Sequence, residues 1–195
     1  MANKDAPFGL RPIRMIGGGD FTGGQDRFDI ASGYTTSLYQ GDLVEPLTNG
    51  TIGRKAAGEN DPVLGVFNGC RYTNPTTGTP TWANTYQQPI AASDIYAFVV
   101  CDPSVVYEVQ ADDTFPTTDL FGNFDIVDNS PVGDTSSGIS HLELDVTTGN
   151  TTATLPLKAI GISTDADNSD TASANTNVVV TINNSVFSGG TDGLA

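Results

Sequence analysis

Apolar residues in this chain recur at alternate positions within short segments, and this spacing suits strands rather than helices. Residues 142–146 read Leu-Glu-Leu-Asp-Val, and residues 178–182 read Val-Val-Val-Thr-Ile. Side chains of a strand point alternately to its two faces, so each segment offers one apolar face to a core. No window of a dozen residues has the 3.6-residue repeat of an amphipathic helix. The pattern therefore predicts an all-β chain.

About ten such segments, separated by turn residues, predict a β-barrel or β-sandwich body. Thr favours strands, and Gly and Asn favour turns, as in the hairpin signal at Asn49-Gly50. One short helical turn is expected between residues 115 and 122, with Thr117 or Thr118 as its cap and Gly122 as its stop. The fold class predicted is thus all-β with at most one short helix.

The chain divides into an extended N-terminal arm at residues 1–25, a body at 26–187 and a flexible C-terminal tail at 188–195. Prolines and the glycine run at 17–19 argue against regular structure in the arm. The arm nevertheless carries too many apolar and basic residues for a solvated segment, so we expect it to dock onto a partner. The candidate docking residues are Phe8, Leu10, Arg11, Ile13 and Arg14.

Charge is distributed unevenly along the 195 residues, which carry a formal net charge of −15. Seven of the eight basic residues lie in residues 1–71, against eight acidic residues there, whereas residues 72–195 hold fifteen acidic residues and Lys158 alone. An acidic field repels phosphate backbones, so nucleic acid is not an expected partner. The longest apolar run, Ile95 to Cys101, is too short to span a membrane, and no signal peptide is visible.

Nucleophilic catalysis needs a base beside Ser or Cys, and His141 is the single histidine. His141 falls on the polar face of its segment, where a surface or interface position is expected. Cys70 and Cys101 each end an apolar stretch and are expected to be buried free thiols, although neighbouring strands would also allow a disulfide.

Carboxylate pairs at Asp112-Asp113 and at Glu143 with Asp145 would suit a glycosidase by number alone. Both pairs occupy turn or outward-facing positions, which favours an ordinary solvated role. The loop 165–170 is only faintly similar to a calcium loop, because no helix flanks it and its sixth and twelfth positions are Asp170 and Thr176. We therefore expect no enzyme, no catalytic residues, no metal site and no cofactor.

Aromatic residues gather in or beside a long loop at residues 72–96. Tyr72, Trp82 and Tyr86 are candidates for an aromatic interface, with Tyr96 nearby. Exposed aromatics line sugar sites and anchor protein interfaces, but the same residues could also fold back as a small core. The sequence leaves both interpretations open.

Several short segments resemble structural proteins of tailed bacteriophages. They are Ala6-Pro7-Phe8-Gly9-Leu10-Arg11-Pro12, Gly41-Asp42-Leu43-Val44, Leu64-Gly65-Val66-Phe67, Asp102-Pro103 followed by Tyr107-Glu108-Val109-Gln110, and residues 178–184. Together they are most similar to the capsid decoration, or cement, proteins, particularly those of marine phages.

The resemblance implies a virion protein on the outer surface of the phage head, assembled in the host cytoplasm. It implies a trimeric or otherwise clustered protein that stabilises the shell by bridging major capsid proteins. Extended arms of such proteins add to a partner's sheet, which agrees with the docking arm expected above. Arg11 and Arg14 would pair with carboxylates of the shell.

Other functions remain as alternatives. A carbohydrate-binding or adhesive module would use Tyr72, Trp82 and Tyr86, and a minor head or tail component of the virion would share the same fold. A glycosidase using Asp112 and Asp113 is the enzyme class that the residues favour least.

Overall fold

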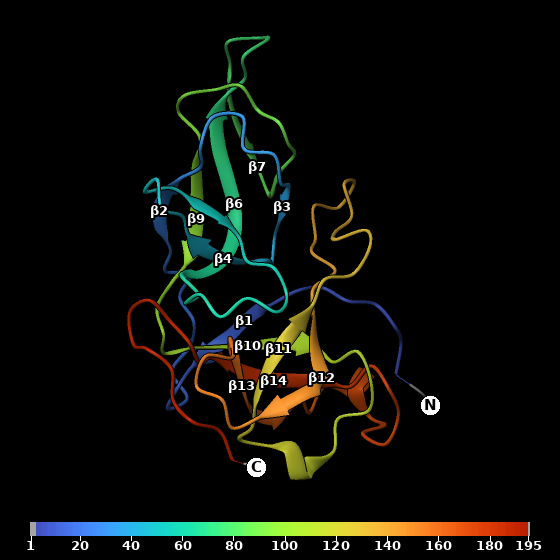
Figure 1. The fold of residues 1–195 in the computed structure, drawn as a ribbon. Helices are drawn as coiled ribbons and strands as arrows, with labels where there is room; N and C mark the ends of the chain where they lie inside the picture. The colour runs from blue at the N-terminus through green and yellow to red at the C-terminus, as the bar shows by residue number, and fades with distance from the viewer. Residues whose placement is uncertain (1–2, 195) are drawn as a thin grey trace.

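The computed structural model describes residues 3–194, and its regular secondary structure consists almost wholly of strands joined by loops (Figure 1). This confirms the all-β prediction. Two 3-10 turns, at Thr117–Asp119 and Ala166–Asn168, are the helical segments of the described residues. The fourteen strands are β1 Arg11–Met15, β2 Asp26–Asp29, β3 Leu38–Tyr39, β4 Leu43–Pro46, β5 Ile52–Arg54, β6 Gly65–Thr73, β7 Pro80–Ala83, β8 Thr85–Tyr86, β9 Tyr96–Val100, β10 Val105–Gln110, β11 Asn123–Val127, β12 Glu143–Asn150, β13 Leu157–Ile162 and β14 Asn177–Ile182.

The strands form two antiparallel sheets, one above the other in Figure 1. Sheet A has the order β1-β10-β14-β13-β11-β12. Sheet B has the order β2-β9-β6-β4-β5, with β7 also paired to β6. A two-stranded ribbon of β3 and β8 lies beside sheet B. The count exceeds the ten strands expected, partly because β3, β5 and β8 are only two or three residues long.

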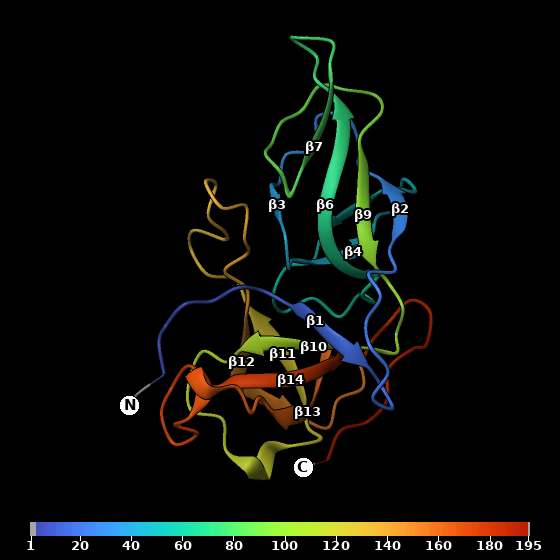
Figure 2. The ribbon, with the colours of Figure 1, turned by 180° about the vertical axis from the view of Figure 1, so that it is seen from behind.

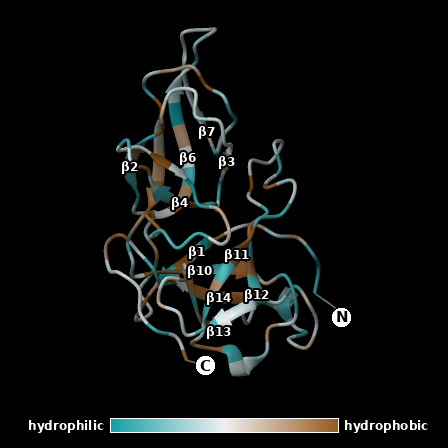
Figure 3. Ribbon diagram, viewed as in Figure 1, coloured by the Kyte–Doolittle hydropathy of each residue, from teal (hydrophilic) through white to brown (hydrophobic). Residues whose placement is uncertain are grey.

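Two apolar clusters form the core. One is lined by sheet A, and Leu43, Val66 and Val100 of sheet B also belong to it. The other lies within the sheet B half of the molecule and includes Phe67 and Tyr86. In Figure 3 the strands carry most of the hydrophobic colour, and the loops are mainly hydrophilic. The shared cluster packs the two sheets together, in an arrangement consistent with the predicted sandwich.

The N-terminal segment is part of sheet A rather than a separate arm. Residues Arg11–Met15 form the edge strand β1, which pairs with β10 (Figure 2). Before this strand, the Ala6 N–H donates to Gln110 Oε1 at 2.9 Å, and Gln110 Nε2 donates to the Lys4 carbonyl at 3.0 Å. The segment therefore covers the outer face of β10, where Glu108 is buried although it points away from the core.

The path of this segment depends on two glycines at the junction of the sheets. Gly9 has φ +68°, and a Cβ at this position would lie 2.7 Å from the Gly41 carbonyl oxygen. Gly41 itself has φ +98°, and its carbonyl accepts a hydrogen bond from Leu10 N–H at 2.9 Å. Side chains at either position would clash with backbone, so the pair lets the N-terminal segment pass close to sheet B.

The C-terminal residues also differ from the expected flexible tail. Asn123 Nδ2 donates to the Thr191 carbonyl at 2.8 Å, Gly193 N–H donates to Thr151 O at 3.0 Å, and Leu194 N–H donates to Phe121 O at 2.9 Å. These bonds hold residues 191–194 against sheet A. The predicted helical turn is present as the 3-10 turn Thr117–Asp119. Its N-cap is Pro116 rather than Thr117 or Thr118, and its C-cap is Leu120 rather than Gly122, so the predicted cap and stop were wrong.

Candidate interaction surface

The five residues predicted to dock the arm have separate environments. Leu10 is 2% exposed and belongs to the sheet A core, and Phe8 is half-buried, with the Arg11 guanidinium 4.9 Å from its ring centre. Arg11 also forms an ion pair with the buried Glu108. Ile13 is 39% exposed, and Arg14 is partly exposed. Phe8, Leu10 and Arg11 therefore contact other parts of the same chain, because β1 pairs with β10.

The predicted aromatic interface also divides. Trp82 on β7 is 68% exposed, whereas Tyr86 on β8 is fully buried and donates its hydroxyl to the Tyr34 carbonyl at 2.8 Å. Tyr72 on β6 is partly buried against the sheet B core. Tyr86 is thus a core residue, and the fold-back alternative holds for it, while Trp82 faces solvent.

Trp82 instead belongs to a different set, which we call the aromatic–arginine stripe: Arg27, Tyr96, Arg71 and Trp82. These residues come from four neighbouring strands, β2, β9, β6 and β7. Arg71 lies directly opposite Trp82 on one side and Tyr96 on the other, so the three side chains share one face of sheet B.

Cations and rings alternate along the stripe. The Arg27 guanidinium carbon lies 4.2 Å from the Tyr96 ring centre, and that of Arg71 lies 6.0 Å from Tyr96 and 5.9 Å from Trp82. Such contacts are attractive because the ring faces are electron-rich. Arg71 Nη1 also pairs with Asp94 Oδ2 at 3.1 Å. The stacking orders long side chains that would otherwise move freely, so the stripe is a pre-formed surface.

The carboxylate of Asp94 is held by several donors beside this surface. Thr73 donates from its hydroxyl to Asp94 Oδ2 at 2.7 Å and from its backbone N–H to Oδ1 at 3.1 Å. These hydrogen bonds, together with Arg71, lower the pKa of Asp94. Asp94 is therefore a fixed negative charge, which neutralises Arg71, while Arg27 has no carboxylate partner among residues 3–194.

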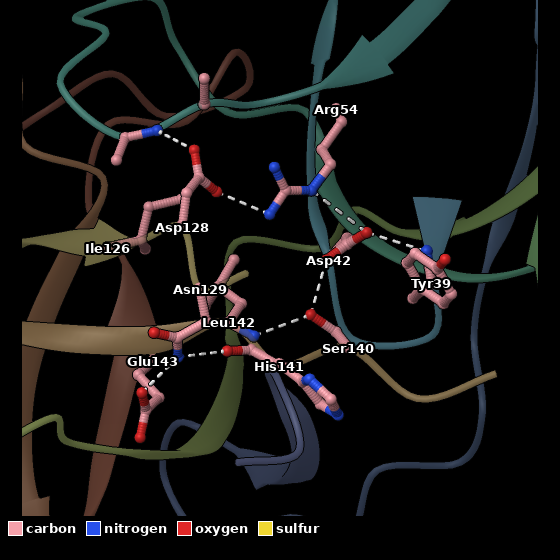
Figure 4. A network of polar contacts seen from close by, with 12 residues as sticks. Tyr39, Asp42, Arg54, Ile126, Asp128, Asn129, Ser140, His141, Leu142 and Glu143 are labelled. Atoms are coloured by element: carbon pink, nitrogen blue, oxygen red, sulfur yellow. Dashed lines mark hydrogen bonds and ion pairs between the residues drawn. The ribbon is translucent and has the colours of Figure 1, made fainter. Parts of the chain in front are cut away.

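A second polar cluster lies between the two sheets and is buried (Figure 4). Asp42 is fully buried, accepts hydrogen bonds from Tyr39 N–H at 2.8 Å and from the Ser140 hydroxyl at 2.6 Å, and lies 3.4 Å from Arg54 Nε. Arg54 Nη2 also pairs with Asp128 at 2.6 Å. Ser140 and Asp128 belong to the loop between β11 and β12, so this polar seam joins that loop to sheet B.

The seam resembles a catalytic site only in its residue types. Ser140 is hydrogen-bonded to a carboxylate, but the His141 ring turns away, with Nδ1 3.0 Å from the Pro131 carbonyl oxygen (Figure 4). The Ser140 hydroxyl oxygen is further engaged by Leu142 N–H at 3.0 Å. No serine–histidine pair therefore forms here.

Two carboxylates predicted to be solvated are partly enclosed: Glu143 is buried, and Asp112 is partly buried. Burial raises the pKa of both Asp112 and Glu143. Asp112 Oδ1 accepts the Val146 N–H at 3.0 Å, and Glu143 accepts a hydrogen bond from Asn129 Nδ2. Both cysteines are free thiols, as predicted; Cys70 is buried, whereas Cys101 is only partly buried.

The acidic side chains of the loop at 165–170 contact neighbouring protein groups. Asp170 Oδ2 accepts the Ser173 hydroxyl at 2.9 Å, and Asp165 Oδ2 lies 3.9 Å from Arg11 Nη2. The part of the chain that the structure describes contains no group of three or more metal-ligating side chains. Likewise, none of its helical segments has the length and apolarity needed to cross a membrane.

The sequence indicates Trp82 as an interface residue, but it does not group Trp82 with Arg27, Arg71 and Tyr96. The alternation of faces within each strand carries part of the information: Arg71 and Tyr96 are each followed by an apolar residue that faces the core, so both point to the outer face of sheet B. Pairing between β6 and β9 was still needed to place them side by side.

No protein-family model matches the sequence, and searches of curated proteins and of solved structures found no match either.

Proposed function

We propose that this chain is a non-enzymatic virion structural protein, a capsid decoration protein that binds the outside of a phage head through the aromatic–arginine stripe. The observation that carries the proposal is the exposed stripe itself. Trp, Tyr and Arg are the residue types that dominate the binding energy of protein interfaces. Here they form one continuous row across four strands.

The stripe differs from the rest of the surface in charge. The chain carries a net charge of −15, whereas the stripe balances its two guanidinium groups against two carboxylates, Asp94 beside Arg71 and Asp29 opposite Tyr96 on β2. A partner that offers apolar surface and carboxylates fits this face, and an acidic body elsewhere disfavours binding in other orientations. The major capsid protein is the partner that the sequence resemblance suggests.

Two further features of the proposal come from the resemblance. Decoration proteins of this kind cluster, so we expect a homotrimer that bridges neighbouring capsid subunits and strengthens the shell. Ile13, Arg14 and Ile16 remain a second exposed apolar and basic group, at the β1 end of the molecule. This group is the part of the predicted docking arm that is still free to contact a partner.

The test mixes the purified chain with undecorated heads of its phage and measures co-sedimentation. Trp82→Ala combined with Arg27→Glu removes one end of the stripe and reverses the charge of the other. Both side chains are exposed, so the fold should persist. Loss of one interface anchor costs about 2 kcal/mol or more, so binding should weaken by at least roughly tenfold.

A matched variant, Ile13→Ala with Arg14→Glu, changes one exposed apolar and one basic residue at the β1 end. It should bind heads nearly as well as the parent chain. If this variant loses binding and the stripe variant does not, the contact lies at β1 and the stripe proposal is wrong. Failure of the parent chain to bind heads at all would contradict the decoration function.

A carbohydrate-binding or adhesive function is the second candidate, and the 68% exposure of Trp82 favours it. An open indole face is a common platform for sugar rings. Binding to a glycan array that disappears in Trp82→Ala, without binding to heads, would support this function over decoration.

A further inference from the structure

A buried lysine lies at the end of β5, where it meets two glutamates. Lys55 is fully buried, which is rare for a lysine, and Glu45 on β4 is 8% exposed. Glu59 follows in the next turn and lies at the solvent side of the pair. The seam around Arg54 and the stripe do not use these three residues.

Pairing between strands β4 and β5 brings the side chains of Glu45 and Lys55 together. Lys55 N–H donates to the Leu43 carbonyl at 2.9 Å, which extends the β4–β5 pairing by one residue, and Glu45 lies two residues further along β4. Long side chains reach such diagonal neighbours. Lys55 Nζ consequently lies 3.5 Å from Glu45 Oε2, and it donates to the Glu59 carbonyl at 3.0 Å.

As an ion pair, this arrangement is poorly satisfied. Glu45 Oε2 is sealed from solvent and accepts no hydrogen bond within residues 3–194. An ammonium has three donors, and Lys55 makes one hydrogen bond among the same residues. Two buried charges with so few hydrogen bonds carry a desolvation cost that their attraction does not fully offset.

The carboxyl of Glu45 is shifted toward its protonated form. Burial raises the pKa of Glu45, Lys55 lowers it, and the adjacent Glu59 carboxyl raises it again. A protonated carboxyl is a better acyl donor to an amine than a carboxylate is, since its hydroxyl can leave as water. Glu59 is open to solvent, its carboxyl lies beside that of Glu45, and its Oε2 accepts the Ala56 N–H at 3.3 Å, so it can accept and return protons.

We propose that Lys55 and Glu45 join in an intramolecular isopeptide bond. Lys55 passes one proton to the glutamate pair, and its neutral Nζ then attacks Cδ of Glu45. The new C–N bond forms, the nitrogen gives up a second proton to the protonated oxygen of Glu45, the C–O bond to that oxygen breaks, and it leaves as one water molecule. An ammonium and a carboxylate thus become one amide and one water, and no oxidant or other reactant is needed.

The fixed geometry favours this condensation in the folded chain alone. Holding an amine against an acyl carbon replaces a bimolecular encounter by an intramolecular one, which is worth several orders of magnitude in rate. The product is also better suited to the site, because a neutral amide removes both buried charges, and its N–H donates to Glu59 O. The bond would lock β4 to β5 independently of any binding role of the stripe.

The experiment is the intact mass of the purified, folded chain. We expect the sequence mass less one water molecule. Tryptic digestion should leave Lys55 uncleaved, and tandem mass spectrometry should place the loss in a linked pair of segments that contain Glu45 and Lys55. The full sequence mass would overturn the proposal, and so would a water loss located elsewhere, such as a succinimide at Asp192-Gly193.

Two variants separate chemistry from folding. Lys55→Arg keeps a cation beside Glu45 but has no amine to acylate, and Glu59→Gln removes the proton acceptor. Both should fold, as judged by circular dichroism, and both should show their full sequence masses. A Lys55→Arg chain that still loses water between β4 and β5 would contradict the assignment.

Discussion

Removing the Arg54 guanidinium should expose how strongly the polar seam holds the two sheets together. In Arg54→Met, the fully buried Asp42 keeps the hydrogen bonds from Tyr39 and Ser140 but loses its cation. Loss of one partner of a buried pair costs about 3–5 kcal/mol, because the other charge remains desolvated. The contact with Asp128, whose side chain is 28% exposed, adds at most about 1 kcal/mol.

Urea denaturation followed by circular dichroism measures this loss directly. For a chain of this size, about 3–5 kcal/mol corresponds to a fall in Tm of roughly 6–20 °C. The matched control, Asp128→Asn, should cost about 1 kcal/mol or less. Adding Asp42→Asn to Arg54→Met should recover part of the stability, since neither charge then remains buried.

The effect should also depend on pH with a definite sign. Burial raises the pKa of Asp42 and Arg54 lowers it, so the variant without Arg54 should have a pKa higher still. An acid whose pKa is raised by folding binds its proton more tightly in the native state, so its charging destabilises the fold as pH rises. The cost of Arg54→Met should therefore shrink as the solution becomes acidic. A cost under about 1 kcal/mol at neutral pH, or additive effects of Arg54→Met and Asp42→Asn, would refute the reasoning.

Two further predictions follow from burial. Leu10→Ala should lower the unfolding free energy by about 2–5 kcal/mol, because it leaves a cavity in the sheet A core. The more exposed Ile13→Ala should change it by less than about 1 kcal/mol. Equal losses for the two variants in urea denaturation would argue against β1 as a packed strand. Burial raises the pKa of Cys70 to about 12, and burial together with Asp26 raises that of Cys101 to about 12. Both thiols should therefore react with a disulfide reagent far more slowly in the native chain than in denaturant, and rapid labelling of the native chain would contradict this.

Alternation within segments predicted the core of sheet A well. Leu142 and Leu144 are fully buried, as are Val178 and Val180, and all four belong to one cluster. Their parity could be read locally, since a strand with one buried face shows its pattern within five residues. The all-β fold class follows from such segments without knowledge of their partners.

The edge strand β1 could not be found in this way. It contains Pro12, and its register with β10 shifts between Pro12 and Arg14, so no alternation is visible. Its stability comes from pairing with residues about a hundred positions later, such as Arg11 with Glu108. From the sequence alone, apolar residues without a local pattern indicate a docking arm, although the structure shows that their partner is in the same chain.

In the long loop at residues 72–96, alternation along the sequence does not predict which aromatic residues are buried. Trp82 and Tyr86 have the same parity in the sequence, yet one is exposed and the other is fully buried. Between them the chain leaves sheet B at Ala83 and joins the β3–β8 ribbon at Thr85, so the direction of the alternation is reset. Parity can be followed only within a strand, and the boundaries of such short strands are set by their partners.

The structure explains why most basic residues lie in the first 71 positions: several of them neutralise buried carboxylates. Arg11, Arg54 and Lys55 face the buried carboxylates Glu108, Asp42 and Glu45, respectively. Each of these three basic residues of the first 71 positions neutralises a carboxylate that would be costly to bury alone, although the Arg11 side chain itself is 56% exposed. Arg27 and Arg71 remain at the surface, ordered by aromatic rings rather than spread along an arm. Basic side chains of the first 71 positions therefore remain at the surface in two places, the N-terminal segment with Lys4 and Arg14, and the stripe, where Asp94 and Asp29 balance Arg71 and Arg27. The stripe is thus a patch of balanced charge on an otherwise acidic chain.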